Sequence, residues 1–218
     1  MIAEIKNTGL TSERTRTRMV ERLREKGIHN EDILNAMNSV PRHAFIDEGL
    51  ASRAYEDSAL PIGFSQTISQ PYVIAFMIEA LMNNRKLGKV LEVGTGCGYQ
   101  TAVLAKLAKE VYSIERIRAL HDKARSNLRS LRLVNVRLHY GDGYLGLAEA
   151  APFDSIILSA APTEIPLALL QQLVIGGKMI LPQGKEEQRL LLITRTANGH
   201  LKIELEAVRF VPLVMGVE

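Results

Sequence analysis

Hydrophobic positions in the first third of the chain follow a helical spacing. Met19, Val20 and Leu23 would lie on one face of a helix, and Gly27 ends this run. Similar spacing recurs twice before residue 83. We therefore expect helices at 11–26, 31–38 and 71–82.

Two residues mark helix starts, and one segment breaks the pattern. Asn30 suits the N-cap of the second helix, and Pro71 suits the first turn of the third. Residues 54–69 show no regular period and contain Gly and Pro. We expect an ordered loop there.

From residue 89 onward, short apolar runs alternate with helical patterns. The expected strands are 89–94, 110–115, 136–140, 153–160 and 178–182, and the expected helices are 99–108, 117–131 and 165–174. This alternation predicts a mostly parallel sheet with helices on both faces. Residues 188–213 instead contain two strand patterns joined at Asn198 and Gly199, a hairpin signal. The predicted fold class is α/β, a doubly wound sheet with an antiparallel C-terminal hairpin and extra N-terminal helices.

Composition narrows the class of protein. The 218 residues are 46% hydrophobic and 23% charged, and no run reaches the roughly 18 apolar residues of a membrane span. The first residues do not resemble a secretory signal, so we expect a cytoplasmic protein with no membrane partner. The lone Cys97 supports neither a disulfide framework nor a zinc site, and we expect no metal.

Charge gives little indication of a nucleic-acid partner. The net charge is +3, with a basic excess among residues 14–26. A solvated helix face explains that excess, since nucleic-acid binding usually needs a denser basic face and stacking aromatics. Trp is absent and aromatic residues make up 5% of the chain. We expect no nucleic-acid partner.

A glycine-rich turn links the first long strand to the next helix. Gly94, Gly96 and Gly98 have the spacing G-x-G-x-G, and the backbone of such a turn can approach a ligand closely. The dinucleotide fingerprint is G-x-G-x-x-G, and no Lys follows at the spacing of a phosphate-binding loop. The turn alone is therefore weak evidence for a ligand and does not identify one.

Acidic residues at successive strand ends favour an adenosine pocket. Glu115 can accept both ribose hydroxyls, and Asp142 can reach an adenine amino group. Each could instead be a strand-end carboxylate bound by backbone amides. Glu92 could accept amides of the glycine turn or face the cationic amino end of a ligand. An adenosine pocket without phosphate-binding chemistry suits S-adenosylmethionine.

These motifs resemble those of known methyltransferases. Residues 91–105, 113–116, 141–143 and 153–157 resemble the class I S-adenosylmethionine-dependent methyltransferases, which implies a Rossmann-like fold. The segments 40–42, 54–57, 60–63, 66–71 and 209–213 are similar to protein-L-isoaspartate O-methyltransferases. The resemblance covers about residues 40–213. Cys97 stands where Ser is common in that family, and we expect it to be a small packing residue.

The resemblance implies an activity and a division of the chain. The enzyme would move a methyl group from S-adenosylmethionine to the free α-carboxyl of L-isoaspartyl residues in damaged proteins and peptides. The resulting ester would return to aspartyl through a succinimide. The single domain at 1–218 would comprise an extension (1–17), N-terminal helices with a substrate loop (18–82), a cofactor-binding core (88–182) and C-terminal strands (188–213). We expect a monomer.

The resemblance also assigns site residues. Ser69 would be the catalytic residue, and a neutral hydroxyl donor suits the reaction because the carboxylate nucleophile is already ionised. Its alternative role is that of a Ser capping the helix at Pro71. The substrate-binding residues would be Gln66, Thr67, Ile68, Arg209, Val211 and Pro212. The cofactor-binding residues would be Glu92, Gly94, Thr95, Gly96, Gly98, Tyr99, Gln100, Thr101, Glu115, Arg116, Gly141, Asp142 and Gly143.

Other functions stay open at this point. Residues 209–212 could simply be an edge strand that packs Phe210 and Val211 into the core. A class I methyltransferase acting on RNA or a small molecule would need stacking aromatics or a polar catalytic turn after the fourth strand. Residues 158–162, Leu-Ser-Ala-Ala-Pro, contain neither a polar amide nor an aromatic residue. A binding module that kept only the fold is the third possibility.

Overall fold

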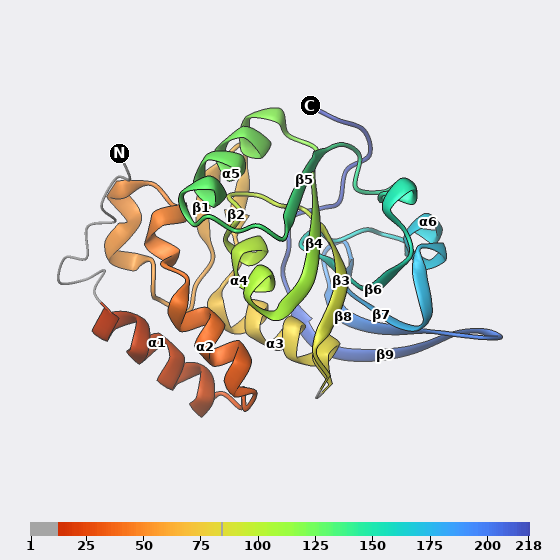
Figure 1. Cartoon of the computed structure of the whole chain (residues 1–218), viewed down its shortest axis with the longest axis horizontal. Coiled ribbons are helices and arrows are strands. Elements are labelled where there is room, and N and C mark those ends of the chain that lie inside the picture. Colours follow the sequence, from red (N-terminus) through yellow and green to blue (C-terminus); the bar gives the residue numbers. More distant parts are fainter. Residues whose placement is uncertain (1–12, 84) are drawn as a thin grey trace.

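The computed structural model of the chain describes residues 13–83 and 85–218 (Figure 1). The expected start of the first helix at Thr11, and residues 1–12 of the expected extension, lie outside the described residues.

Three N-terminal helices confirm the helical spacing of the first third. They are α1 (Glu13–Glu25), α2 (Glu31–Ser39) and α3 (Pro71–Met82). Asn30 is the N-cap of α2, where its side chain accepts a hydrogen bond from the amide of Ile33 at 3.2 Å. Pro71 begins α3 as expected. Short 3-10 helices lie at Arg42–Phe45 and Glu48–Arg53.

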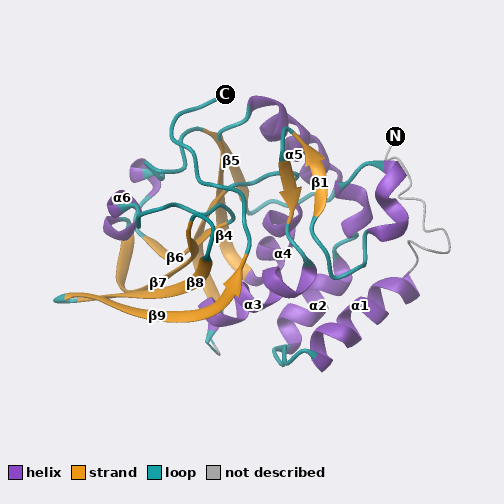
Figure 2. Ribbon diagram, turned by 180° about the vertical axis from the view of Figure 1, so that it is seen from behind, coloured by secondary structure: helices purple, strands orange, loops and turns teal. Residues whose placement is uncertain are grey.

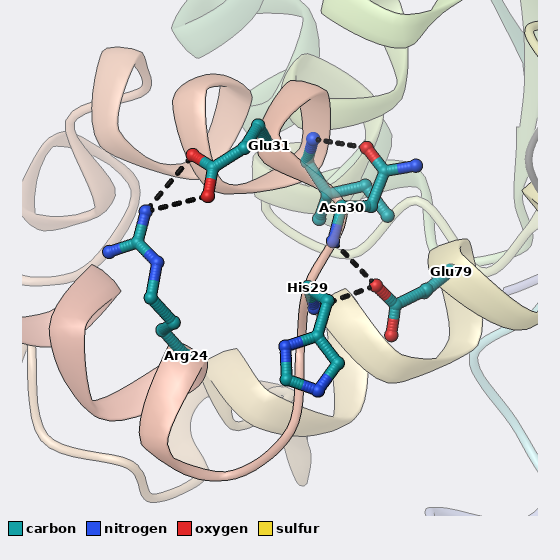
Figure 3. A network of polar contacts seen from close by, with 6 residues as sticks. Arg24, His29, Asn30, Glu31 and Glu79 are labelled. Atoms are coloured by element: carbon teal, nitrogen blue, oxygen red, sulfur yellow. Dashed lines mark hydrogen bonds and ion pairs between the residues drawn. The ribbon is translucent and has the colours of Figure 1, made fainter.

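A carboxylate on α3 fixes the turn between α1 and α2. Glu79 Oε1 accepts hydrogen bonds from the amides of His29 at 3.0 Å and Asn30 at 2.8 Å, as Figure 3 shows. Arg24 of α1 pairs with Glu31 of α2 at 2.9 Å in the same network. These contacts join α1 and α2 to each other and to α3.

The central sheet has seven strands in the order β5-β4-β3-β6-β7-β8-β9. The strands are β3 (Leu87–Val93), β4 (Ala108–Glu115), β5 (Val136–Tyr140), β6 (Phe153–Leu158), β7 (Leu173–Gly184), β8 (Gln188–Thr196) and β9 (Gly199–Val208). The pairs from β5 to β7 are parallel, and β7-β8 and β8-β9 are antiparallel. The predicted α/β class and the hairpin at Asn198 and Gly199 are confirmed. The chain order reverses at β3 and β6, which is where open α/β sheets bind ligands.

Helices cover the two faces of the sheet unequally (Figures 1 and 2). The helices α3, α4 (Tyr99–Leu107) and α5 (Arg118–Ser130) lie over one face, with α1 and α2 beyond them. The larger core cluster joins these helices to sheet residues such as Val90 and Val111. The other face carries a smaller cluster around Phe153 and Ile156, covered mainly by the short helix α6 (Leu167–Gln171). Each fully buried aliphatic side chain stabilises the fold by about 1.5–3 kcal/mol.

The prediction of a loop at 54–69 was wrong in part. This segment contains an antiparallel hairpin of β1 (Leu60–Gly63) and β2 (Gln66–Ile68). Phe64 and Ser65 form its turn with φ of 54° and 55°, a left-handed conformation that favours Gly or Asn. Because the sequence lacks the usual Asn-Gly signal there, the hairpin was not expected.

Several boundaries differ from prediction in the C-terminal half: the strand expected at 153–160 ends at Leu158, and the strand expected at 178–182 spans Leu173–Gly184. The helix expected at 165–174 ends at Gln171, and Leu173 already begins β7. A short apolar run is compatible with a helix or with a strand, and the pairing of Leu173 with Phe153 makes residue 173 part of a strand. The placement of Arg209–Pro212 in the last strand was also wrong, since β9 ends at Val208. Pro212 forms only an isolated bridge with Ala161.

Candidate functional site

The glycine turn between β3 and α4 needs its glycines. Gly94, Gly96 and Gly98 have φ values of 93°, 55° and 91°, which other residues rarely adopt. A Cβ on Gly98 would also come within 3.2 Å of the Leu128 side chain of α5. The turn therefore lies close to its neighbours, with backbone exposed toward the carboxyl ends of the strands.

Glu92 organises a buried polar network beneath this turn. Its carboxylate accepts hydrogen bonds from the Gln100 amide at 3.0 Å and from the hydroxyls of Thr101 and Ser113, both at 2.5 Å. Thr95 bonds Ser113 at 2.6 Å. Complete burial raises the pKa of Glu92 to about 7, although the three hydrogen bonds act in the opposite direction. Glu92 thus holds side chains of α4 and β4 rather than the amides of the turn.

Glu115, at the end of β4, connects the turn to the next strand. One carboxylate oxygen accepts the amide of Gly96 at 2.8 Å, and the other accepts the amide of Ile117 at 2.9 Å. Backbone amides therefore bind this carboxylate, as the alternative interpretation expected. Glu115 also lines the cavity described below, and its contact with a ribose stays a prediction.

Ser69 lies between β2 and α3 and does not cap the helix. The N-cap of α3 is Gln70, without a side-chain cap bond. The amide of Tyr72 in the first turn donates instead to Asp57 at 2.9 Å. The structure therefore excludes the capping role of Ser69 and leaves its half-buried hydroxyl at the cavity.

The chain after β9 folds back over the strand ends. Val211 and Leu213 pair with Ala161 through two backbone hydrogen bonds of 2.8 Å. Further along, the amide of Gly216 donates to Asp142 Oδ2 at 2.7 Å, and Asp142 Oδ1 accepts the amide of Tyr144 at 2.9 Å. Asp142 therefore binds backbone amides, one of them from this C-terminal segment.

Arg116 and the adjacent backbone hold the end of the same segment. Arg116 donates to the carbonyl of Gly216 at 3.1 Å and pairs with the Glu218 carboxylate at 3.0 Å. The amide of Arg118 donates to the main-chain oxygen of Glu218 at 2.7 Å, and the amide of Glu218 donates to the carbonyl of Arg116 at 2.8 Å. Residues 209–218, here named the tail, are thus fastened to the ends of β4 and β5.

Two adjoining cavities lie between these segments. The first is bounded by the glycine turn, the β1-β2 hairpin and the tail, and it includes the ends of β3 and β4. The second lies between Ala59, the start of α3 and Arg209–Val211, with a volume of about 410 Å³. Four residues line both: Thr67, Ser69, Ser159 and Val211. The cavities meet at these four side chains.

Most of the predicted site residues line the first cavity. These are Gln66, Thr67, Ile68, Ser69, Gly94, Thr95, Gly96, Tyr99, Gln100, Glu115, Arg116, Gly143, Val211 and Pro212. Arg209 lines the second cavity. Glu92, Gly98, Thr101, Gly141 and Asp142 do not line either one.

Sequence reasoning missed several residues of the first cavity. Its apolar part includes Ile62, Ile74, Ile114, Ile117, Leu120, Leu213 and Val214. Scattered aliphatic residues carry no motif, so only the fold collects them. Ser159 and Ala160, directly after β6, were also missed, although their place at a strand end near the reversal of chain order was a usable signal.

Arg42 connects the hairpin region to the glycine-turn helix. It is fully buried, and its guanidinium lies over the Tyr99 ring, 5.0 Å from the centroid. It also donates to the carbonyl of Ser58 at 3.3 Å. Burial lowers the pKa of Arg42 from its ordinary value. The residue holds the segment before β1 against α4.

The cavity chemistry fits S-adenosylmethionine. Gly96 provides a close backbone approach, Glu115 supplies an acceptor beside it, and Ile117 and Leu120 offer an apolar wall for a base. Within the described residues, no group of three or more His, Cys, Asp or Glu could hold a metal ion. In the same part of the chain, no helix has the length and apolar character needed to cross a membrane.

Comparison with known sequences gives a consistent result. The model of the protein-L-isoaspartate(D-aspartate) O-methyltransferase family matches residues 14–218. The chain is 60% identical to the protein-L-isoaspartate O-methyltransferase of Dechloromonas aromatica (strain RCB) over 211 residues, 96% of this chain and 98% of the relative. It is 58% identical to that of Methylobacillus flagellatus over 218 residues, with 98% of each covered.

Solved structures agree with the sequences. A protein-L-isoaspartate O-methyltransferase structure superposes with a TM-score of 0.85 at 28% identity, covering 92% of this chain and 67% of the other. A Plasmodium falciparum structure, described as a beta-aspartate methyltransferase in complex with S-adenosyl-L-homocysteine, gives a TM-score of 0.81 at 29% identity. It covers 91% of this chain and 98% of that one.

Proposed function

The chain belongs to the protein-L-isoaspartate(D-aspartate) O-methyltransferase family, and from that premise we propose how its two cavities divide the reaction. The enzyme moves a methyl group from S-adenosylmethionine to the free α-carboxyl of L-isoaspartyl residues in proteins and peptides. We propose that the first cavity holds the methyl donor and the second holds the peptide. The four residues common to both cavities carry this proposal, because transfer requires the two ligands to meet.

The donor supplies an electrophilic methyl group: the carboxylate oxygen bonds to its carbon while the C–S electron pair stays on sulfur, giving a neutral ester and thioether. No proton moves, so the protein needs no general base. Its residues must instead align the carboxylate at about 3–3.5 Å from the methyl carbon and exclude water. We propose that the hydroxyls of Ser69 and Thr67 align the carboxylate by hydrogen bonds, with Ser69 as the catalytic residue.

The remaining predicted residues divide between the two ligands. We propose that Glu115 binds the ribose and that Arg209, Val211 and Pro212 bind the peptide backbone beside Gln66 and Ile68. Glu92 supports the cofactor site from below through Gln100 and Thr101. Asp142 supports it by fastening the tail, since both of its oxygens already accept backbone amides. Its contact with an adenine amino group stays a prediction.

A methyl-transfer assay tests the function directly. Two synthetic peptides that differ only in an isoaspartyl or an aspartyl linkage are incubated with labelled S-adenosylmethionine. We expect label on the isoaspartyl peptide alone. Labelling of both peptides, or of neither, would contradict the proposed function, and labelling of an RNA instead would favour the alternative class I activity.

We also propose that the protein works as a monomer in the cytoplasm on damaged proteins. The open second cavity suits an extended peptide, and a lone buried Cys97 is compatible with a reducing compartment. Size-exclusion chromatography with light scattering should give a mass near 24.2 kDa. A mass of twice that value would contradict the monomer.

A further inference from the structure

Ser159 occupies a special position between the cavities. It directly follows β6, beside β3, and its amide donates to the carbonyl of Val93 at 2.9 Å. This backbone bond fixes the residue at the reversal of chain order in the sheet. Its half-buried side chain lines both cavities. Among the four shared residues, Ser159 alone comes from the end of a central strand, while the others come from the hairpin and the tail.

The Glu92 network determines where the Ser159 hydrogen points. The Gln100 side-chain amide donates to Glu92 at 3.0 Å and to Ser159 Oγ at 2.8 Å. Both hydrogens of that amide are thereby used, and the carboxylate partner fixes its orientation. Ser159 Oγ is therefore an acceptor toward Gln100, so its own hydrogen is available for another acceptor. Within the described residues, no hydrogen bond donated by the Ser159 hydroxyl is present, and the residue lines both cavities.

We propose that Ser159 donates a hydrogen bond to the isoaspartyl carboxylate and positions it for methyl transfer. This inference rests on the proposed function. Ser69 would reach the same carboxylate from the hairpin side, and Ser159 from the rigid sheet. Two neutral donors can hold the non-attacking oxygen and leave the other free to attack. Neutral hydroxyls suit this role, because a cationic clamp would stabilise the charged ground state more than the less charged transition state.

The position of Ser159 also gives it a different role from the hydroxyls of the hairpin. Ser159 is held through Gln100 and Glu92, on or beside the central strands, so its hydroxyl is positioned independently of the hairpin and the tail. Such a donor defines where the carboxylate must lie for methyl transfer. Preorganised donors of this kind lower the cost of orienting a substrate.

Kinetics of Ser159→Ala test the proposal against a matched control on the same strand, Ser155→Ala. Ser155 is buried on β6 and lines neither cavity. We expect Ser159→Ala to lower kcat/KM for an isoaspartyl peptide about tenfold, as for loss of a hydrogen bond to a charged group. Ser159→Thr, which keeps the hydroxyl, should stay within about threefold of the parent, and Ser155→Ala within about twofold.

Two binding measurements separate a substrate contact from a cofactor contact or a structural role. Calorimetry with S-adenosylhomocysteine should give the same Kd for Ser159→Ala and the parent, within about twofold. Binding of a fluorescent isoaspartyl peptide to the protein saturated with S-adenosylhomocysteine should weaken. Should the Ala variant fail to fold, Ser159→Cys, with nearly the same shape and a weaker donor, should show the same selective loss.

The outcomes are distinct. Unchanged kcat/KM in Ser159→Ala, with the parent active, overturns this inference and leaves the proposed function intact. A loss confined to S-adenosylhomocysteine affinity places the hydroxyl on the cofactor and also overturns it. A parent enzyme that does not methylate the isoaspartyl peptide defeats the proposed function and this inference with it.

Discussion

The floor and the roof of the first cavity are built in opposite ways. The floor, defined as the glycine turn at 94–98 with Glu92, Gln100, Thr101 and Ser113, comes mostly from one short stretch of chain and is largely buried. The roof, defined as the β1-β2 hairpin with Ser69 together with the tail at 209–218, comes from segments far apart in sequence. Many of its residues are exposed, including Phe64 and Met215 at 54% and 69%.

The floor and the roof therefore have different roles: the floor fixes the shape of the site, and the roof controls access to the first cavity. The floor is fixed by hydrogen bonds inside the core, where an unpaired polar group costs about 1–3 kcal/mol. The roof combines apolar hairpin side chains that reach the core, Ile62 and Ile68, with exposed contacts of the tail such as the Arg116–Glu218 ion pair, a type of contact worth about 0.2–1 kcal/mol. The first cavity encloses only about 90 Å³ in this structure, well below the roughly 300 Å³ or more of ligand pockets. We expect the roof to move when the cofactor enters, while the floor stays in place.

The largest effect should follow from removing the Glu92 carboxylate, which organises the floor. Glu92→Ala leaves three buried donors without their acceptor, so we expect the free energy of unfolding to fall by about 2–4 kcal/mol. Urea denaturation measures the change. Glu110→Ala on β4, whose carboxylate is partly exposed, is the control and should cost less than about 1 kcal/mol. Equal losses in the two variants would refute the importance of the buried network.

Breaking the roof at Ser69 should affect catalysis and leave the fold intact. We expect Ser69→Ala to lower kcat about 10- to 100-fold, because the hydroxyl orients the carboxylate in the transition state. The Kd for S-adenosylhomocysteine should change less than about threefold, since the floor is intact. Ser65→Ala, at the tip of the same hairpin and outside both cavities, is the control. Full activity of Ser69→Ala would remove Ser69 from the reaction.

The floor should also show its own pH dependence of stability. The pKa of Glu92 rises on folding from about 4.5 to about 7, so between these values the folded state binds more protons than the unfolded state. Stability from this group is therefore present at low pH and is lost as pH rises through about 7. We expect the free energy of unfolding to fall by about 2 kcal/mol between pH 5.5 and 8.5.

The comparison of Glu92→Gln with the parent isolates this effect, because the amide does not titrate. Denaturation at both pH values should show the fall in the parent and its absence in the variant. The same fall in both proteins would assign the pH dependence to other groups.

Loosening the tail should have a smaller effect, limited to cofactor retention. Arg116→Ala removes two exposed contacts to residues 216 and 218, and we expect S-adenosylhomocysteine to dissociate about 3- to 10-fold faster. Stopped-flow displacement measures this rate. Arg129→Ala, an exposed residue of α5 outside the first cavity, is the control. An unchanged dissociation rate would show that the tail does not restrain the cofactor.

Cys97 in the floor is expected to have no effect on function beyond packing. Its thiol is 2% exposed, and burial raises its pKa, so little reactive thiolate forms at neutral pH. We expect iodoacetamide at pH 7.5 to modify the native protein at least about 100-fold more slowly than the protein in urea. Mass spectrometry follows the reaction. Rapid labelling of the native protein, with loss of activity, would give Cys97 a role beyond packing.

The floor could be predicted from sequence because its signals are local. Gly94, Gly96 and Gly98 mark a turn that only glycines tolerate, and Glu115 follows at the end of the next strand. The roof left weaker signals. The hairpin turn at Phe64 and Ser65 uses left-handed residues without glycine, and the residues after Val208 read as a continued strand.

The sequence by itself determined the alternation of strands and helices, the glycine turn, and the family to which Ser69 and its neighbours point. These features depend on spacing and backbone preference within a few residues. Only the tertiary structure decided which side chains come together: Ser159 lines the same two cavities as Ser69, and Asp142 holds the tail. Such neighbours depend on how distant segments pack together, and no local pattern in the sequence predicts this packing.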